Sequence, residues 1–257
     1  MIRAVFFDID GTLVSFNTHR IPDSTLASLR ELRARGVRLF IATGRPASIV
    51  DNLGDLRFDG YVTLNGGVCI VDDRIIYRRS IPNDDIKALL EYNDSHDRFP
   101  CIFVLDGVMA MLNRNDTVDS VMTMLNIKMP RPSSRAEILS GNVYQILAFF
   151  APDNDTEVMR HMPGSETTRW TELFTDIIPQ GSNKGVGLEK MLAHFGLKKE
   201  ECMAFGDGGN DIEMLRYAGI GVAMGNASDN VKASADYVTS TVDDDGIRNA
   251  LLHFGLL

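Results

Sequence analysis

The order of apolar runs in the first 64 residues restricts this chain to a fold in which strands and helices alternate. Residues 3–9, 37–42 and 61–64 are short apolar runs, which is the pattern of strands buried on both faces. Leucines at positions 26, 29 and 32 have helical spacing between the first two runs, and Pro46 opens a second predicted helix. Because short connections join these elements in turn, the sequence predicts a doubly wound, Rossmann-like parallel sheet of the α/β class.

The alternation stops after the third strand and returns near the end of the chain. Between residues 81 and 181 we predict an α+β module with antiparallel strands, which has helices at 84–93, 116–126 and 155–161 and strands at 101–105, 108–112, 143–150 and 170–177. After it, a helix at 185–195, a strand at 202–205, a helix at 210–218 and a strand at 219–223 resume the first pattern. We therefore expect a core domain made from residues 1–80 and 182–257, with a second domain inserted at 81–181.

The composition argues against several classes of protein. Of the 257 residues 44% are hydrophobic, and 26 Lys and Arg against 35 Asp and Glu give a formal net charge of -9. A surface of that charge repels nucleic acid and anionic lipid, and no apolar stretch approaches the ~20 residues of a membrane span. The three cysteines stand far apart in apolar runs, which predicts reduced thiols. We expect a cytoplasmic protein, monomeric or weakly dimeric, with no nucleic-acid or membrane partner.

An acidic turn, Asp8-Ile9-Asp10-Gly11-Thr12, follows the first predicted strand. In open parallel sheets ligands bind at the carboxyl ends of the strands, and two carboxylates two positions apart can face one centre once the chain leaves the strand. The alternative is an Asp-rich turn in which Thr12 caps the next segment. The turn alone does not decide between these interpretations.

A second acidic segment, Gly206-Asp207-Gly208-Gly209-Asn210-Asp211, follows a later strand and opens a helix. It lacks the third glycine of a dinucleotide-binding fingerprint, and it lacks the features of an EF-hand loop. Carboxylate and amide oxygens at a strand end suit a hard cation such as Mg²⁺. A helix N-cap would explain one of these polar residues but not all three.

Two further segments stand at strand ends or helix starts. Thr43-Gly44-Arg45 closes the second strand, where a hydroxyl and backbone N–H groups can hold phosphate oxygens, although for this tripeptide alone an ordinary strand-to-helix turn is the favoured explanation. Lys184 opens a helix, where its charge opposes the helix dipole, and the alternative is a solvated surface charge. The order of the four segments allows one crevice to collect them all.

Together these segments resemble the four motifs of the haloacid dehalogenase superfamily of phosphatases, at residues 8–12 (DIDGT), 42–45 (ATGR), 184 and 206–211 (GDGGND). Residues 63–67 (TLNGG) and 222–227 (VAMGNA) are similar to the Cof-type subfamily. The position of the inserted domain, between the second and third motifs, resembles that of a C2B cap. The resemblance covers nearly the whole chain and implies a magnesium-dependent phosphatase similar to bacterial sugar-phosphate phosphatases.

The resemblance also implies a role for each matching residue. Asp8 is expected to be the nucleophile and Asp10 the general acid and base. The expected metal ligands are Asp8, the backbone carbonyl of Asp10, and Asp207. Asp211 is expected to support these ligands without contacting the metal. The residues expected to bind the phosphoryl group are Ile9, Thr43, Gly44, Lys184 and Asn210. Arg45 and Asn65 either contact the substrate or stabilise their loops.

We weigh three hypotheses for the function. The first is a hydrolase of small phosphate esters, hexose phosphates before others, that works through an aspartyl-phosphate. The second is a phosphosugar mutase that uses the same aspartyl-phosphate to move phosphate within a sugar. The third is a noncatalytic binding module, which predicts a lost nucleophile or lysine, whereas Asp8 and Lys184 are both present.

Overall fold

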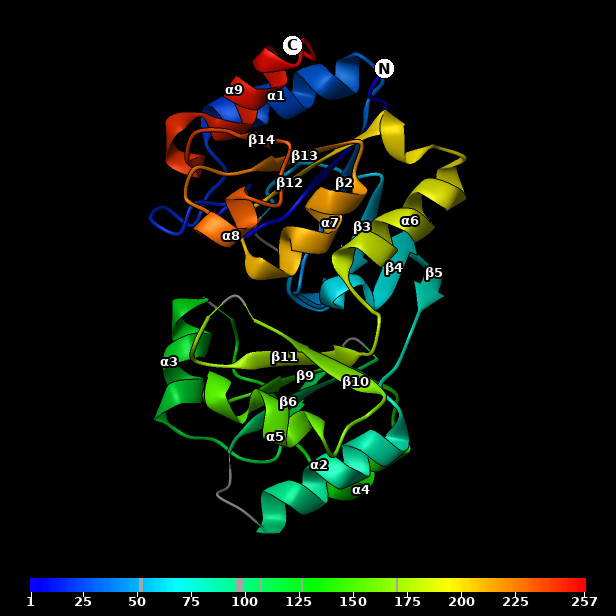
Figure 1. The fold of residues 1–257 in the computed structure, drawn as a ribbon, viewed down its shortest axis with the longest axis vertical. Helices are drawn as coiled ribbons and strands as arrows, with labels where there is room; N and C mark the ends of the chain where they lie inside the picture. Colours follow the sequence, from blue (N-terminus) through cyan, green and yellow to red (C-terminus); the bar gives the residue numbers. More distant parts are fainter. Residues whose placement is uncertain (51–52, 96–98, 107, 126, 170) are drawn as a thin grey trace. The chain divides into compact units, whose positions relative to one another are not determined.

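The computed structural model covers residues 1–257 and describes all of them except 51–52, 96–98, 107, 126 and 170 (Figure 1). The chain separates into two compact units. Unit 1 comprises Met1–Arg45, Val50–Arg78 and Asn183–Leu257, and unit 2 comprises Pro46–Ile49 and Arg79–Ser182. The predicted boundaries of the core and inserted domains, after residues 80 and 181, stay a prediction.

Unit 1 is built on an eight-stranded sheet with the strand order β14-β13-β12-β1-β2-β3-β4-β5. Its strands are β1 (Ala4–Phe7), β2 (Arg38–Ala42), β3 (Gly60–Thr63), β4 (Val68–Val71), β5 (Arg74–Arg78), β12 (Cys202–Gly206), β13 (Ile220–Ala223) and β14 (Tyr237–Val238). All neighbouring strands from β14 to β3 run parallel, and β4 and β5 form an antiparallel hairpin at the edge. The first strand therefore lies in the middle of the sheet, between β12 and β2.

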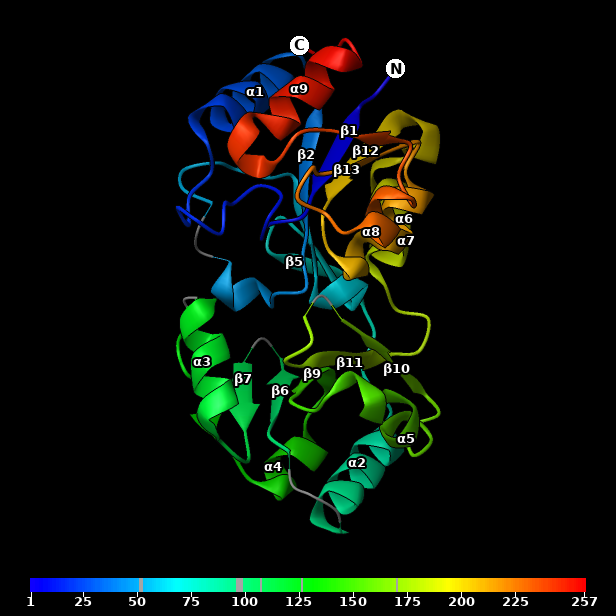
Figure 2. The same cartoon turned by 60° about the vertical axis from the view of Figure 1, so that its left-hand side comes forward.

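Helices cover both faces of this sheet, as Figure 2 shows. They are α1 (Asp23–Ala34), α6 (Lys184–Phe195), α7 (Ile212–Tyr217), α8 (Asp229–Lys232) and α9 (Gly246–His253). Because side chains alternate along a strand, Phe6 packs on Phe40 in the core below α6 and α7, whereas Phe7 packs on Phe205 in the core below α1 and α9. The predicted fold class, a doubly wound parallel sheet with an inserted α+β part, is confirmed.

Unit 2 contains a six-stranded sheet with the order β10-β11-β9-β6-β7-β8. Its strands are β6 (Cys101–Leu105), β7 (Val108–Met111), β8 (Arg131–Pro132), β9 (Val143–Ala148), β10 (Ser165–Thr168) and β11 (Thr175–Pro179), and its helices are α2 (Asn83–Ser95), α3 (Asp116–Met124), α4 (Arg135–Ser140) and α5 (Asp155–Met159). All pairs are antiparallel except β7 with β8. Apolar residues of α2, α4, α5 and the sheet form a third core.

Three predicted elements differ in type or in extent from those of the structure. The helix expected after Pro46 is a 3₁₀ turn over Ala47–Ile49, and Gly54, with φ +61°, takes up a left-handed conformation a few residues later. The strand expected at 170–177 begins at Thr175; residue 170 lies outside the described residues. The helix expected at 210–218 starts as a 3₁₀ turn over Gly209–Asp211, because the Asp211 side chain bonds back to the turn.

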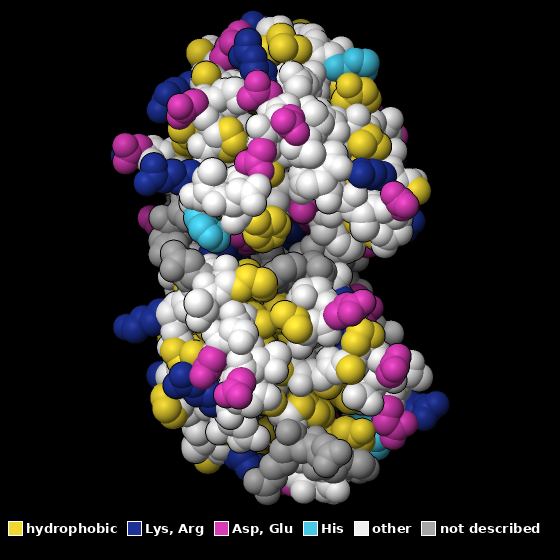
Figure 3. Space-filling view, turned by 90° about the vertical axis from the view of Figure 1, so that its left-hand side faces the viewer, with side chains coloured by type: hydrophobic (Ala, Val, Ile, Leu, Met, Phe, Trp, Pro, Cys, Tyr) yellow, Lys and Arg dark blue, Asp and Glu magenta, His cyan; other side chains and the backbone are white. Residues whose placement is uncertain are grey.

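The surface carries charges of both signs. On the face drawn in Figure 3, acidic and basic side chains are interspersed. The three cysteines, at positions 69, 101 and 202, are buried and free, as predicted. None of the helices in the described ranges combines the length and the apolar character that a bilayer span requires.

Candidate active site

The acidic turn after β1 lies at the middle of the unit 1 sheet. The backbone N–H of Asp8 donates to the carbonyl of Phe205, so the pairing of β1 with β12 continues to Asp8. Gly11 has φ +87°, and a Cβ there would stand 2.3 Å from Asp207 Oδ2. Only glycine allows this approach of the two acidic segments.

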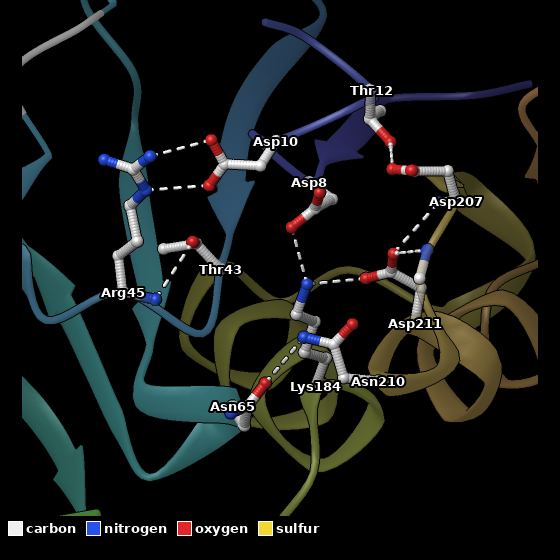
Figure 4. A network of polar contacts seen from close by, with 11 residues as sticks. Asp8, Asp10, Thr12, Thr43, Arg45, Asn65, Lys184, Asp207, Asn210 and Asp211 are labelled. Atoms are coloured by element: carbon white, nitrogen blue, oxygen red, sulfur yellow. Dashed lines mark hydrogen bonds and ion pairs between the residues drawn. The ribbon is translucent and has the colours of Figure 1, made fainter. Parts of the chain in front are cut away.

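Lys184 lies between two of the predicted acidic residues. Its side chain is fully buried, and its Nζ lies 2.6 Å from Asp8 Oδ1 and 2.5 Å from Asp211 Oδ1 (Figure 4). Burial alone would lower the pKa of the ammonium, but Asp211 and Asp8 raise it above its usual value. The surface alternative for Lys184 is therefore wrong, because the lysine is the central cation of a buried cluster.

The Asp207–Asp211 segment is folded around its own carboxylate. Asp211 is fully buried, and its Oδ2 accepts hydrogen bonds from the backbone N–H groups of Asp207 and Gly208. This leaves Oδ1 for Lys184. Asp207 extends from the same turn, and its Oδ1 accepts a hydrogen bond of 2.7 Å from Thr12 Oγ1.

Negative charge exceeds positive charge at this cluster. Burial, opposed by Lys184 and reinforced by Asp211 and Asp207, raises the pKa of Asp8 well above its usual value. Burial, followed by the charge of Asp211, raises the pKa of Asp207 from 3.8 to about 7. Burial is the larger cause of both shifts, and the crowding of several carboxylates around one ammonium group adds to it.

The cluster has the chemistry of a divalent-metal site. One carboxylate oxygen from each of Asp8, Asp207 and Asp211 lies within 4.8 Å of the others. Hard, all-oxygen donors of net negative charge suit a divalent cation such as Mg²⁺, which would offset the burial and the mutual repulsion of these carboxylates. Within the described residues, Asp10 does not belong to this group of three carboxylates.

The Asp10 side chain faces Arg45 instead. Arg45 Nε lies 2.7 Å from Asp10 Oδ2, and Nη2 lies 2.7 Å from Oδ1. The turn after β2 holds this arginine, because the backbone N–H of Arg45 donates to Thr43 Oγ1 at 3.1 Å. Thr43 is almost fully buried. It lies beside the cluster in Figure 4.

A pair of amide side chains joins the turn after β3 to the Asp207–Asp211 segment. Asn210 Nδ2 donates to Asn65 Oδ1 at 2.9 Å, and Asn65 is buried in a left-handed conformation with φ +50°. A Cβ on Gly44 would stand 3.2 Å from the Asn65 amide, so the predicted phosphate-binding turn packs against it. Through these contacts Asn65 stabilises the loop in which it lies.

A family model of haloacid dehalogenase-like hydrolases matches residues 5–251, nearly the whole chain. The chain belongs to the haloacid dehalogenase-like hydrolase family. A putative phosphatase of Bacillus subtilis, YkrA, is 32% identical over 99% of this chain and 98% of its own length. The predicted resemblance to Cof-type phosphatases is therefore confirmed, and so is the predicted enzyme class, a phosphoric monoester hydrolase.

Solved structures of this family agree with that membership. The subclass IIB sugar phosphatase BT4131 has a TM-score of 0.95 and 43% identity, covering 99% of this chain and 100% of its own. BT1666 from Bacteroides thetaiotaomicron, a phosphatase of the same superfamily, has a TM-score of 0.93 and 36% identity, covering 100% of this chain and 96% of its own.

In this haloacid dehalogenase-like hydrolase the predicted residues fall into three sets. One set forms the acidic cluster and consists of Asp8, Lys184, Asp207 and Asp211. A second set borders it and consists of Thr43, Gly44, Asn65 and Asn210. Asp10 and Arg45 pair with each other, and the Ile9 side chain is fully buried, so only its backbone can face a substrate.

Sequence reasoning missed one residue of this neighbourhood. The side chain of Asn226, in the loop after β13, donates to both Gly11 and Asp207. Its only signal in the sequence was its place in the VAMGNA segment.

Proposed function

We propose that this hydrolase removes phosphate from small phosphorylated metabolites, hexose phosphates before others, with Mg²⁺ as cofactor and an aspartyl-phosphate on Asp8. The observation that carries the proposal is the buried contact between Asp8 and Lys184, at 2.6 Å, inside a cluster of three carboxylates. The buried ammonium group of Lys184 opposes the effect of burial on the pKa of Asp8 and so favours the ionised carboxylate that attacks phosphorus, and the same ammonium offsets the charge of the incoming phosphate.

The roles of the side chains follow from their contacts. Lys184 engages Asp8 Oδ1, so we assign the attack to Oδ2. Attack forms an acyl-phosphate bond to Asp8 and breaks the ester bond to the leaving oxygen. Thr43 Oγ1 accepts from the Arg45 N–H, which leaves its own proton for a phosphoryl oxygen. The backbone of Ile9 and Gly44, with Asn210, would complete the contacts to the phosphoryl group.

The metal would be held by the carboxylates of Asp8 and Asp207 and by the backbone carbonyl of Asp10. When bound, the divalent ion supplies positive charge to the phosphoryl oxygens. Asp211 would stabilise this arrangement through its contact with Lys184 and through the hydrogen bonds that it accepts from the N–H groups of its own turn.

Asp10 would carry the proton. It would protonate the leaving oxygen in the first step and accept a proton from water in the second, when water attacks the acyl phosphate and releases inorganic phosphate and free Asp8. Arg45 would hold the Asp10 side chain in place until a substrate binds.

The substrate class rests on likeness to relatives. The 43% identity with a sugar phosphatase over nearly the full chain supports sugar phosphates, and we propose that residues 81–181 form a C2B cap that selects the leaving group. The net charge of -9 supports a protein without nucleic-acid or anionic-membrane partners, and we propose a cytoplasmic enzyme that is a monomer or a weak homodimer.

The test is release of inorganic phosphate from a panel of phosphate esters, which should include hexose phosphates, pyridoxal phosphate and flavin mononucleotide, with Mg²⁺ and with a chelator. We expect turnover with Mg²⁺, its loss with the chelator, and a loss on the order of 10⁴-fold or more in folded Asp8→Asn. Hydroxylamine trapping followed by mass spectrometry should modify Asp8. Flat activity across the panel would contradict the proposal.

A mutase makes a different prediction for the same panel. It converts one sugar monophosphate to an isomer, needs a bisphosphate primer, and releases little inorganic phosphate. Phosphate release without a primer therefore separates the two functions.

A further inference from the structure

Asn226, in the loop after β13, connects this loop to the loops after β1, β12 and β14. Its Nδ2 donates to the carbonyl of Gly11 at 2.9 Å and to Asp207 Oδ2 at 3.1 Å. Its Oδ1 accepts from the backbone N–H of Val242 at 3.1 Å. Because the Val242 N–H can only donate, it determines which end of the Asn226 amide faces the acidic turn.

The Asp207 carboxylate is held from two sides. Thr12 Oγ1 donates to its Oδ1 at 2.7 Å, and Asn226 Nδ2 donates to its Oδ2. A carboxylate with one donor on each oxygen has a fixed plane, while each oxygen keeps a further lone pair for another partner. The free lone pairs are available to a cation.

Packing does not explain Asn226. The residue is exposed, so its side chain contributes little by burial. Its two donated hydrogen bonds both go to the acidic turns that approach each other at Gly11, where a Cβ would collide with Asp207. The side chain therefore sets the distance and orientation between these turns.

We infer that Asn226 is a positioning residue that orients Asp207 for a divalent metal, an inference that rests on the proposed metal-dependent function. It acts through the hydrogen bond to Asp207 and through the Gly11 carbonyl, next to Asp10. Residues that orient metal ligands in this way change metal affinity by about 10- to 100-fold when they are removed.

Isothermal titration of the full-length protein with MgCl₂ tests the inference without substrate. We expect Asn226→Ala to weaken Mg²⁺ binding by about 10-fold or more. The matched control is Asn249→Ala, which removes an exposed amide bonded to Ser240 and Asp244 and does not touch Asp207. This control should bind Mg²⁺ as the wild type does.

A second readout separates positioning from general stability. The rise in melting temperature that a fixed Mg²⁺ concentration causes should shrink in Asn226→Ala and stay unchanged in Asn249→Ala. The metal-free melting temperatures of the two variants should be similar. If Asn226→Ala does not fold, Asn226→Ser, which is too short to reach both acceptors, takes its place.

The outcomes distinguish this inference from the proposed function. Wild-type affinity in Asn226→Ala, or an equal loss in the Asn249 variant, would overturn the positioning role and leave the metal-dependent function intact. Lack of Mg²⁺ binding by the wild type would overturn both.

Discussion

The guanidinium of Arg45 holds the carboxylate of Asp10 in a bidentate ion pair, with both nitrogen–oxygen distances at 2.7 Å. Both Asp10 oxygens accept hydrogen bonds from a cation in this arrangement. Asp10 must therefore exchange Arg45 for the substrate before it can donate a proton to a leaving group, as we propose. The ion pair with Arg45 is therefore the state of the Asp10 side chain before substrate binds.

A leaving-group comparison tests the role of Asp10. We expect Asp10→Asn to lower turnover of a hexose phosphate by ~10²–10⁴-fold, because an amide cannot supply the proton that a sugar alkoxide needs. Nitrophenyl phosphate, whose leaving group needs no proton, should give a burst of nitrophenol and then slow turnover, since the second step still lacks its base. Rapid mixing measures the burst.

The control for this experiment is Asp73→Asn, at an exposed turn of the β4–β5 hairpin. It should behave as the wild type with both substrates. Equal loss on both substrates, without a burst, would contradict the proton-transfer role.

Removal of Lys184 should destabilise the fold as well as abolish turnover. Lys184→Met leaves Asp8 and Asp211 buried without their shared ammonium, and breaking a buried ion pair in this way costs about 3–5 kcal/mol of unfolding free energy. Urea unfolding of the metal-free protein near neutral pH measures the loss. The matched variant is Lys190→Met on the same helix, whose pairing with Glu189 is exposed and should contribute less than about 1 kcal/mol. Similar stability of the two variants would contradict the burial argument.

The raised pKa of Asp207 predicts a dependence of stability on pH. Between pH 3.8 and about pH 7 the folded state binds more protons at the Asp207 carboxyl than the unfolded state does. The free energy of unfolding contributed by Asp207 therefore decreases as pH rises through this window. Chemical unfolding of the metal-free protein at several pH values should show a flatter profile for Asp207→Asn than for the wild type. An identical profile would show that Asp207 titrates normally.

The close packing of Gly66 predicts a further effect on stability. Gly66 has φ +89°, and a Cβ there would stand 2.0 Å from the carbonyl oxygen of Asn183, the residue before Lys184. We expect Gly66→Ala to cost more than about 2 kcal/mol, from strain and overpacking together. Gly36→Ala, at φ +80° with no atom within 4 Å, should cost only about 1–2 kcal/mol from strain. Equal unfolding free energies would show that the Asn183 backbone can shift.

The sequence predicted much of the site because each segment ends a strand or starts a helix. Asp8 follows β1, Lys184 begins α6 and Asp207 follows β12, and parallel topology brings such positions to one edge of a sheet. It could not predict the contact of Asn226 with Asp207, because that contact depends on β13 being the neighbour of β12, and alternation of elements does not specify strand order.

In the inserted part, weaker patterns limited the prediction. The strand β10 was missed because its sequence, SETT, has no apolar alternation, yet it pairs along its whole length with β11.

The pairing of Asp10 with Arg45, in the core, was also missed. Charge signs allowed it, but 35 positions separate the two residues and only the pairing of β1 with β2 brings them together.

The place of β1 in the sheet has a consequence for how the protein is made. One of its two neighbours, β12, begins only at Cys202, so a growing chain carries β1 with one unpaired, apolar edge until that residue has been made. An unpaired strand edge is prone to aggregate, and such long-range pairing forms late. We therefore expect a nascent chain that ends before residue 202 to depend on chaperones, and the acidic cluster to form only after residue 211 leaves the ribosome.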